Sequence, residues 1–348
     1  MNAPAVTPSM RHDDIQFHNV AQTRDVDDHD GLLLQRVPEA VRDRLNEGAQ
    51  DRMCHPAGVE LRFVPDGPVE ITLSTRPGSA AEGTVRVFWG PIQDTREWVV
   101  GTDPETIEIT PPERLDELTD EATDDLAFDP AVCRVVLPGE HRGGHVFYHG
   151  MEGDVRPPRD AELPDRRYLA YGTSITEGEA PLAEHLNYVS QTARRLDADL
   201  INLGSCGTAY CDKAMAEYIA ARDDWDVATL ALSINMVDTF SRRQFRERAA
   251  SMIDTVAGAN PEKPVAVVTI YTNARDVCED ADPDSECEAF RRILRDVVTQ
   301  TPHSNVFLLE GQRMLPDVGG LTTDLVHPGD NAMIRMGENV ASELDERL

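Results

Sequence analysis

The hydrophobic pattern of this 348-residue chain changes once, between residues 156 and 166. Before that point, apolar and polar residues alternate in short runs such as Val59–Val64 and Val69–Leu73, with Gly, Pro and Asp between the runs. A period of two is typical of antiparallel strands with one buried face. We therefore predict an all-β sandwich of the jelly-roll type over residues 21–155, preceded by a flexible N-terminus at residues 1–20.

After residue 166 the apolar runs become continuous and alternate with amphipathic helices. This pattern indicates a parallel sheet covered on both faces, and so a three-layer α/β/α domain over residues 167–348. Residues 156–166 are rich in proline and form the predicted linker. One helix is expected to begin at a capping box made by Ser241 and Gln244. The predicted strands are Arg167–Tyr171, Asp199–Leu203, Val227–Ser233, Pro264–Tyr271 and Asn305–Leu309.

The chain is strongly acidic, with 63 Asp and Glu residues against 33 Lys and Arg residues and a formal net charge of -30. Nucleic acids and anionic lipid surfaces require clusters of basic residues, so neither is expected as a partner. Molar salt screens the self-repulsion of such a chain, and we therefore expect a salt-adapted source organism. The alternative is an ordinary acidic protein with an acidic face for a partner.

The sequence gives little indication of a signal peptide, a membrane span or a metal site. Met1–Gln22 has no apolar core of signal-peptide length and no run of about 18 apolar residues occurs, so we expect a cytoplasmic protein without a membrane span. The six cysteines form no CxxC pair, and no metal or cofactor is expected. Cys278 and Cys287 either form a local disulfide or stay free, and Cys206 and Cys211 either line a site or are buried thiols. A strand edge of the sandwich could support a homodimer.

Polar residues follow the predicted parallel strands where open α/β sheets bind ligands, at the carboxyl ends. Ser174 follows the first strand, Gly204 the second and Asn235 the third. Near the end of the chain, Asp324 and His327 are three residues apart, a spacing that lets the carboxylate orient the imidazole. Taken singly, Ser174 and Asn235 are also ordinary helix caps. Together these residues predict an acyl-transfer site.

The order Gly172-Thr173-Ser174, Asn202-Leu203-Gly204, Asn235 and Asp324-Leu325-Val326-His327 resembles the SGNH hydrolases, also called GDSL-like esterases. The resemblance covers residues 167–348 and implies a flavodoxin-like sheet. The β-rich half is similar to the jelly-roll domain that precedes the hydrolase domain in some carbohydrate-esterase-like members.

The resemblance implies a role for each of these residues. Ser174 would be the nucleophile, His327 the general base and Asp324 its orienting carboxylate. Ser174, Gly204 and Asn235 would donate hydrogen bonds to the oxyanion.

Two departures from the family pattern place the chain in a divergent branch. Thr173 replaces an aspartate beside the serine, and Met236 replaces an aspartate after Asn235. Thr173 and Met236 are therefore candidate substrate-binding residues, and an apolar wall at Met236 would favour a small acyl group. His185, in the segment after the first strand, is a third candidate, and the favoured alternative for it is a solvated helix or loop residue.

The sequence thus predicts a serine esterase or deacetylase that hydrolyses small acyl esters, with acetylated carbohydrate as one candidate substrate. An acyltransferase or a thioesterase would use the same triad, because only the acyl acceptor differs. A carbohydrate-binding protein without catalysis, in which the sandwich binds the sugar, is the alternative from another class.

Overall fold

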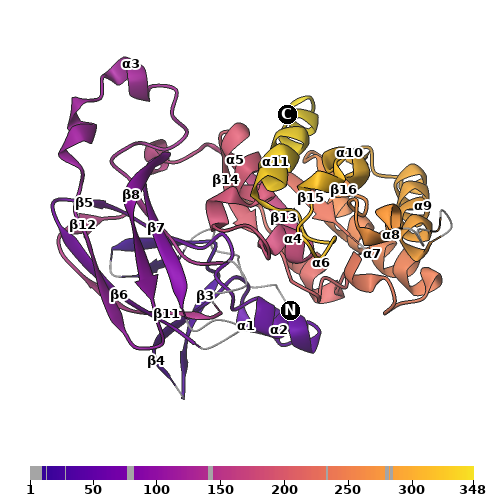
Figure 1. Ribbon diagram of the computed structural model, residues 1–348, viewed down its shortest axis with the longest axis horizontal. Helices are drawn as coiled ribbons and strands as arrows, with labels where there is room; N and C mark the ends of the chain where they lie inside the picture. The colour runs from indigo at the N-terminus through magenta and orange to yellow at the C-terminus, as the bar shows by residue number, and fades with distance from the viewer. Residues whose placement is uncertain are drawn as a thin grey trace.

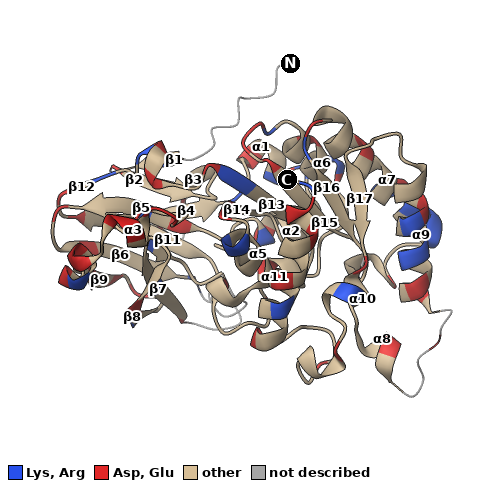
Figure 2. Ribbon diagram, turned by 90° about the horizontal axis from the view of Figure 1, so that it is seen from above, with Lys and Arg blue, Asp and Glu red and all other residues tan. Residues whose placement is uncertain are grey.

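The computed structural model describes residues 10–12, 14–27, 29–76, 82–139, 144–232, 234–278, 282 and 285–348 of the chain. These residues form a β-rich N-terminal domain and a C-terminal domain of alternating strands and helices, which lie side by side (Figure 1). Acidic side chains occur along the ribbons of both domains (Figure 2).

The N-terminal domain contains two antiparallel sheets with a shared apolar core. Inward-facing residues of both sheets, among them Phe17, Leu61, Ile71 and Val135, are fully buried in this core. The predicted all-β sandwich is confirmed, and its jelly-roll type stays a prediction. One sheet has the order β1 (Met10–His12), β2 (Ile15–His18), β5 (Glu60–Pro65), β10 (Cys133–Val136), β7 (Gly83–Trp89) and β8 (Ile92–Val100), with β12 (Val155–Arg156) also paired to β5. The other has the order β3 (Gln22–Val26), β4 (His29–Gln35), β11 (Val146–Glu152), β6 (Val69–Thr75) and β9 (Glu105–Ile109).

Part of the N-terminal segment, residues 1–20, was predicted to be flexible but forms strands of the sandwich. Residues 1–9 lie outside the described part of the chain, but β1 and β2 belong to the first sheet. Ile15 and Phe17 are both 0% exposed in the sandwich core, so burial of these side chains holds the segment in place. The sandwich therefore begins about ten residues before the predicted boundary at residue 21.

Helices that the alternating pattern did not predict interrupt the sandwich between β4 and β5. They are α1 (Glu39–Arg42) and α2 (Glu47–Arg52), and the Asn46 side chain caps α2 by accepting a hydrogen bond from the Ala49 amide. Val37, Leu45 and Met53 are buried in an apolar cluster that belongs mainly to the C-terminal domain. This helical segment is thus part of the contact between the domains. The short helix α3 (Asp120–Thr123) lies later in the same half of the chain.

The predicted linker has regular structure at both of its ends. Arg156 is the last residue of β12, and it forms an ion pair with Glu162 of a short 3-10 helix, Asp160–Glu162. Arg166 already belongs to the first strand of the next domain.

The C-terminal domain is built on a five-stranded parallel sheet. Its order places the second strand of the domain at one edge, next to the first, which is the flavodoxin-like arrangement that the resemblance implied. The strands are β14 (Ala198–Asn202), β13 (Arg166–Tyr171), β15 (Val227–Ala231), β16 (Val265–Val268) and β17 (Val306–Leu309), in spatial order. Each overlaps a predicted strand, although β16 ends three residues before Tyr271 and Ser233 lies outside the described residues.

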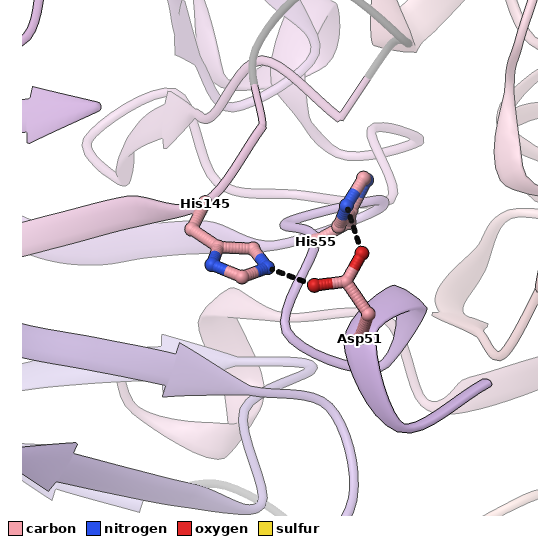
Figure 3. Close-up of side chains that lie close together, drawn as sticks. All are labelled: Asp51, His55 and His145. Atoms are coloured by element: carbon pink, nitrogen blue, oxygen red, sulfur yellow. Dashed lines mark ion pairs between the residues drawn. The ribbon is translucent and has the colours of Figure 1, made fainter. Parts of the chain in front are cut away.

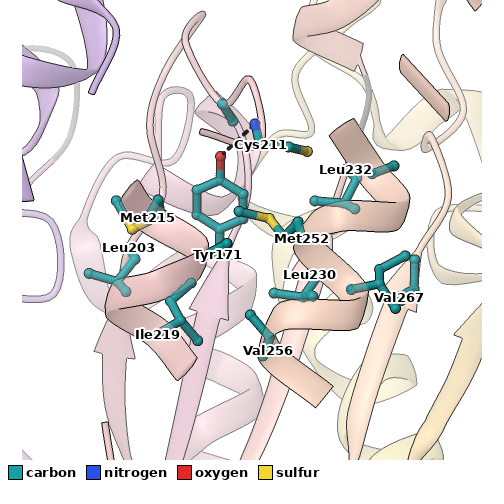
Figure 4. Close-up of a cluster of buried hydrophobic side chains, with 14 of the residues drawn as sticks. Tyr171, Leu203, Cys211, Met215, Ile219, Leu230, Leu232, Met252, Val256 and Val267 are labelled. Carbon is teal, nitrogen blue, oxygen red and sulfur yellow. Dashed lines mark hydrogen bonds between the residues drawn. The ribbon is translucent and has the colours of Figure 1, made fainter. Parts of the chain in front are cut away.

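Helices cover both faces of this sheet. Residues of α6 (Lys213–Ala220), α7 (Arg242–Ala259) and α9 (Glu286–Gln300) pack against one face, and residues of α5 (Tyr188–Arg195) and α11 (Asp330–Asp345) against the other. Figure 4 shows the first of these cores, where Met252 and Val256 of α7 point toward the sheet. The predicted capping box of Ser241 and Gln244 opens α7. The short helices α8 (Ala274–Val277) and α10 (Gly311–Met314) follow β16 and β17.

All six cysteines are free thiols, so Cys278 and Cys287 do not form the disulfide that the sequence left open. Burial raises the pKa of Cys211 to about 12, which keeps this thiol protonated. In the described part of the chain, no helix has both the length and the apolar character needed to cross a bilayer.

Candidate active site

Ser174 lies where β13 meets a short helix at the carboxyl end of the sheet. The strand ends at Tyr171, and α4 (Ser174–Glu177) begins after Gly172 and one more residue. Glycine is needed there, because a Cβ atom at position 172 would lie 2.2 Å from Thr176 Oγ1. This close turn leaves Ser174 5% exposed.

His327 approaches Ser174 from the far end of the sequence. Its Nε2 atom is 2.8 Å from Ser174 Oγ, and its Nδ1 atom is 2.7 Å from Asp324 Oδ2. The structure therefore brings the three predicted residues together in one continuous row of hydrogen bonds. In such a row, one imidazole nitrogen faces the hydroxyl and the other is held by the carboxylate.

Asp324 is held in a dense set of hydrogen bonds. Its Oδ1 atom accepts bonds from the amides of Val326 and His327, at 2.8 and 2.9 Å, and from Thr322 Oγ1 at 2.9 Å. Burial raises the pKa of Asp324, but the bonds from His327, Val326 and Thr322 outweigh burial and hold this pKa well below its usual range. The ionised carboxylate favours a proton on His327 Nδ1, which leaves the Nε2 lone pair facing Ser174.

The turn between Asp324 and His327 includes a strained residue. Leu325 has a φ of +57°, in the left-handed region that costs about 1 kcal/mol for a residue with a side chain. Its carbonyl accepts a 2.6 Å bond from the Ala274 amide, and the Thr322 amide donates to the His327 carbonyl at 2.8 Å. These bonds compensate for the strain and fix the position of the imidazole.

Gly204 does not have the surroundings that the sequence prediction requires. Its amide already donates a 2.8 Å hydrogen bond to Asn202 Oδ1. A Cβ atom at this position would lie 2.3 Å from the Glu177 amide nitrogen, so Gly204 is a contact point between two backbone segments. The assignment of Gly204 as an oxyanion donor is therefore corrected, because the amide is occupied inside the protein.

Gly207, in the same loop, has the properties that Gly204 lacks. It is exposed, its φ is +69°, and no atom lies within 4 Å of the position of a Cβ atom. Asn235 lies near this loop, since its Oδ1 atom accepts a 3.3 Å bond from the Ala209 amide. In the described part of the chain, no hydrogen bond uses the amides of Ser174 and Gly207 or the Nδ2 atom of Asn235. All three donors are therefore without a partner in the described part of the chain.

The three predicted substrate-binding residues lie in different places. Thr173 is 3% exposed and lines a small cavity with Asn273 and Val326. Thr173 directly precedes Ser174 in the chain, and Val326 directly precedes His327. His185 is half-buried against Phe88 of the N-terminal domain, in a cavity between the domains.

Met236 is fully buried at 0% exposed, within the core that contains Phe245. It forms no wall for a substrate in this structure. The prediction for Met236 is therefore wrong, because the side chain is fully buried in the core with Phe245 and presents no surface to a ligand.

Residues of the N-terminal domain contact the loop after β14 and the short helix α4 that begins at Ser174. The sequence prediction missed these contacts. The buried Arg36 guanidinium donates to the carbonyls of Asn202 and Gly204 at 3.0 and 2.9 Å. Glu177, at the end of the serine helix, faces His55 Nδ1 at 3.2 Å and accepts a hydrogen bond from the Cys206 amide. No local motif marks Arg36 or His55 for this role, because their partners in the C-terminal domain lie more than a hundred residues away.

A row of buried ion pairs crosses from the sandwich to the sheet. Arg62 of β5 forms a bidentate pair with Asp199 of β14, at 2.8 and 2.6 Å, and also donates to Glu60 at 2.7 Å. Glu60 in turn accepts from Arg134. Burial raises the pKa of Glu60, but the charges of Arg134 and Arg62 outweigh it and hold this pKa well below the usual range. These charges fix the sandwich against the edge strand.

Comparison with known proteins agrees with this architecture. The model of the GDSL-like Lipase/Acylhydrolase family matches residues 165–345, more than half of the chain. The chain belongs to this family, and it is an enzyme of a class that hydrolyses ester bonds. No curated protein matches the sequence.

Solved structures share the fold over nearly the whole chain. A salicylyl-acyltransferase from a tetracycline biosynthetic pathway has a TM-score of 0.76 at 15% identity, covering 99% of this chain and 98% of its own. A GDSL-like lipase from Bacteroides ovatus has a TM-score of 0.67 at 16% identity, covering 90% and 91%. A family two carbohydrate esterase from Cellvibrio japonicus has a TM-score of 0.60 at 15% identity, covering 98% and 96%. At these identities the likeness concerns the fold.

Proposed function

We propose that this protein is a serine esterase in which Ser174 is the nucleophile, His327 the general base and Asp324 the residue that orients it. The observation that carries the proposal is the 2.8 Å contact of His327 Nε2 with Ser174 Oγ, together with the 2.7 Å contact of His327 Nδ1 with Asp324. For the oxyanion we propose the Ser174 amide, the Gly207 amide and Asn235 Nδ2, because these donors have no partner among the described residues.

The reaction follows from this geometry. His327 Nε2 takes the hydroxyl proton as Ser174 Oγ attacks the ester carbonyl, and the oxyanion receives hydrogen bonds from the three donors. His327 then gives the proton to the leaving alcohol, which leaves an acyl group on Ser174. Water, activated by the same imidazole, hydrolyses this acyl-enzyme and restores the free serine.

Small acyl groups are the proposed substrates. The cavity that Thr173, Asn273 and Val326 help to line is small, and it adjoins Ser174 and His327 along the chain. The carbohydrate esterase with the same two-domain fold supports acetylated carbohydrate as the alcohol portion. A purified enzyme that hydrolyses acetyl esters faster than octanoyl esters would agree with this proposal.

Acyl transfer is a second candidate, because a structure similar over 99% of this chain is an acyltransferase. Both activities pass through the same acyl-enzyme, so only the acceptor separates them. Competition between water and added sugar hydroxyls or thiols during turnover distinguishes the two: new esters or thioesters indicate transfer, and free acid alone indicates hydrolysis.

The direct test is intact-mass spectrometry after treatment with a fluorophosphonate in high salt. We expect a single adduct on the wild-type chain and none on Ser174→Ala, with Ser205→Ala as a labelled control because Ser205 Oγ bonds to Thr208 and not to a histidine. A folded wild-type protein without an adduct would contradict the proposed role of Ser174. Sugar binding without any turnover would then favour the binding-protein alternative.

We also propose that the acidic composition is an adaptation to salt. With a net charge of -30, the folded chain repels itself at low ionic strength, and molar salt screens that repulsion. The free energy of unfolding, measured by denaturation with urea, is expected to rise between dilute buffer and molar KCl. An unchanged or falling value would point to the ordinary acidic alternative.

A further inference from the structure

Three side chains of the N-terminal domain converge at a point that the serine chemistry does not use. Asp51 lies in the last turn of α2, His55 follows that helix, and His145 directly precedes β11. Figure 3 shows the Asp51 carboxylate between the two imidazole rings. One ligand atom from each residue lies within 4.8 Å of the other two, so the three residues could share one ion.

The distances between these atoms fit a small divalent ion. His145 Nε2 is 3.0 Å from Asp51 Oδ1, and His55 Nε2 is 3.6 Å from Asp51 Oδ2. A tetrahedral zinc ion with bonds of about 2.0–2.1 Å separates its ligand atoms by about 3.3 Å. The two observed spacings, each to a different oxygen of Asp51, lie on either side of that value.

The environment of His145 is difficult to explain by hydrogen bonding alone. Both of its ring nitrogens are buried without a hydrogen-bond partner among the described residues, and the contact of Nε2 with Asp51 Oδ1 at 3.0 Å is an ion pair. A buried polar atom without a partner costs free energy, and a metal ion would use the lone pair of Nε2. The Asp51 side chain is 61% exposed, which leaves a route for an ion from solvent.

His55 has the outer contact that is typical of a metal-binding histidine. Its Nδ1 atom faces Glu177 Oε1 at 3.2 Å, while Nε2 faces Asp51. A carboxylate on one nitrogen fixes the tautomer and directs the lone pair of the other nitrogen to the metal. Glu177 is buried and lies on the same short helix as Ser174.

We propose that Asp51, His55 and His145 bind a divalent transition-metal ion, with zinc as the best match. Two imidazole nitrogens and one carboxylate oxygen form a ligand set that suits zinc, with water as the fourth ligand. Such an ion would join α2 to the start of β11 and, through His55 and Glu177, to the serine helix. The role of the ion is to hold the N-terminal domain against the serine helix α4. The ion takes no part in the proton transfers. The sequence expectation of no metal is replaced by this proposal.

The test is calorimetric titration of tag-free, chelator-treated protein with zinc chloride. We expect one zinc per wild-type chain and at least about a tenfold loss of affinity in His145→Gln and in Asp51→Asn. The matched control is His303→Gln, which removes an Asp254–His303 pair that belongs to no cluster of three metal ligands among the described residues, and it should leave binding unchanged. Cobalt(II) should give the strong visible absorption of a tetrahedral site in the wild type and lose it in the two variants.

Two results would overturn the proposal. One is a folded wild-type chain that binds no zinc or cobalt. The other is stoichiometric binding that Asp51→Asn leaves unchanged, since the exposed Asp51 can be replaced without disturbing a core even where His145→Gln fails to fold. Either result would leave the three residues as an ion-pair cluster only.

Discussion

Two polar regions of this molecule touch the same sheet and differ in burial. The serine edge, which consists of Ser174, Asn235, Asp324 and His327, is partly open, with the His327 and Asp324 side chains 21% and 50% exposed. The junction between the domains, which consists of Arg36, Glu60, Arg62, Arg134 and Asp199, is closed, with the Arg62 and Asp199 side chains 1% and 5% exposed.

The difference shows two uses of polar groups. At the serine edge, hydrogen bonds hold the His327 imidazole between the Asp324 carboxylate and the Ser174 hydroxyl. At the junction, charges are paired with other charges or with backbone carbonyls, and removal of one partner leaves a buried group without compensation. Substitutions at the serine edge should therefore change turnover with little change in stability, and substitutions at the junction should first change stability.

The largest expected effect separates the two regions most clearly. Asp324→Asn should lower kcat by about 10³–10⁴-fold, because the amide no longer fixes the imidazole tautomer. The free energy of unfolding should fall by less than in a junction variant, because Asn keeps an Oδ1 atom that can accept the bonds from Thr322, Val326 and His327. Hydrolysis of an aryl acetate measures the first quantity and urea denaturation the second. Asp254→Asn, at the exposed Asp254–His303 pair, is the control. If Asp324→Asn retained wild-type turnover, the proposed role of Asp324 would have to be abandoned.

Arg36→Met tests the junction. Arg36 donates to the carbonyls of Arg52, His55, Asn202 and Gly204. The variant leaves the His55 and Gly204 carbonyls without a partner among the described residues, while the Arg52 and Asn202 carbonyls keep one other hydrogen bond each. We expect a loss of about 3 kcal/mol or more in the free energy of unfolding.

The control for this variant is Arg246→Met, because the pair of Arg246 with Asp296 is exposed and contributes little. If Arg36→Met kept the wild-type free energy of unfolding but lost activity, the junction would affect turnover and not stability. That result would contradict the comparison between the two regions.

Asn235→Ala sharpens the description of the serine edge. Removal of one oxyanion donor should lower kcat by about 10²–10³-fold, with KM nearly unchanged, because the bond forms mainly in the transition state. Steady-state kinetics on an acetyl ester gives both constants. Asn46→Ala, which removes the cap of α2, is the comparison variant and should reduce stability instead. An equal kcat in wild type and Asn235→Ala would exclude the asparagine as a donor.

The smallest expected effect concerns pH at the junction. Burial lowers the pKa of His18 from 6.5 to about 4, with the charge of Arg62 acting in the same direction. The folded state therefore holds His18 neutral, while the unfolded chain gains a proton as the pH falls through 6.5. The free energy of unfolding should fall by about 2 kcal/mol from pH 7 to pH 5 on this account.

The neighbouring carboxyl groups of Asp199 and Glu60 have lowered pKa values, so they titrate below this window. His18→Gln should remove most of the loss, since Gln does not titrate. Urea denaturation at both pH values measures the slope. An identical slope in both proteins would mean that another group is responsible.

Much of the serine edge could be predicted from the sequence. The continuous apolar strands predicted a parallel sheet, and the carboxyl ends of such strands share one edge, so Ser174 and Asn235 were expected together. Asp324 and His327 are neighbours in the chain, and their contact depends on a local turn. Gly204 was assigned wrongly, because two glycines lie in one loop and only the hydrogen bond to Asn202 shows which amide is occupied.

The junction could not be predicted from the sequence, for a physical reason. A pattern of period two or 3.6 records which face of a strand or helix is buried, but it does not record which distant element covers that face. Arg36, Arg62 and His55 look like solvated residues until Gly204, Asp199 and Glu177 are brought to them by the fold. The sequence alone thus determined the two fold classes, the acidic composition and the serine row. The tertiary structure decided which domain surfaces meet and which buried charges compensate one another, because the pairings that join the two domains, such as Arg62 with Asp199, connect residues more than a hundred positions apart.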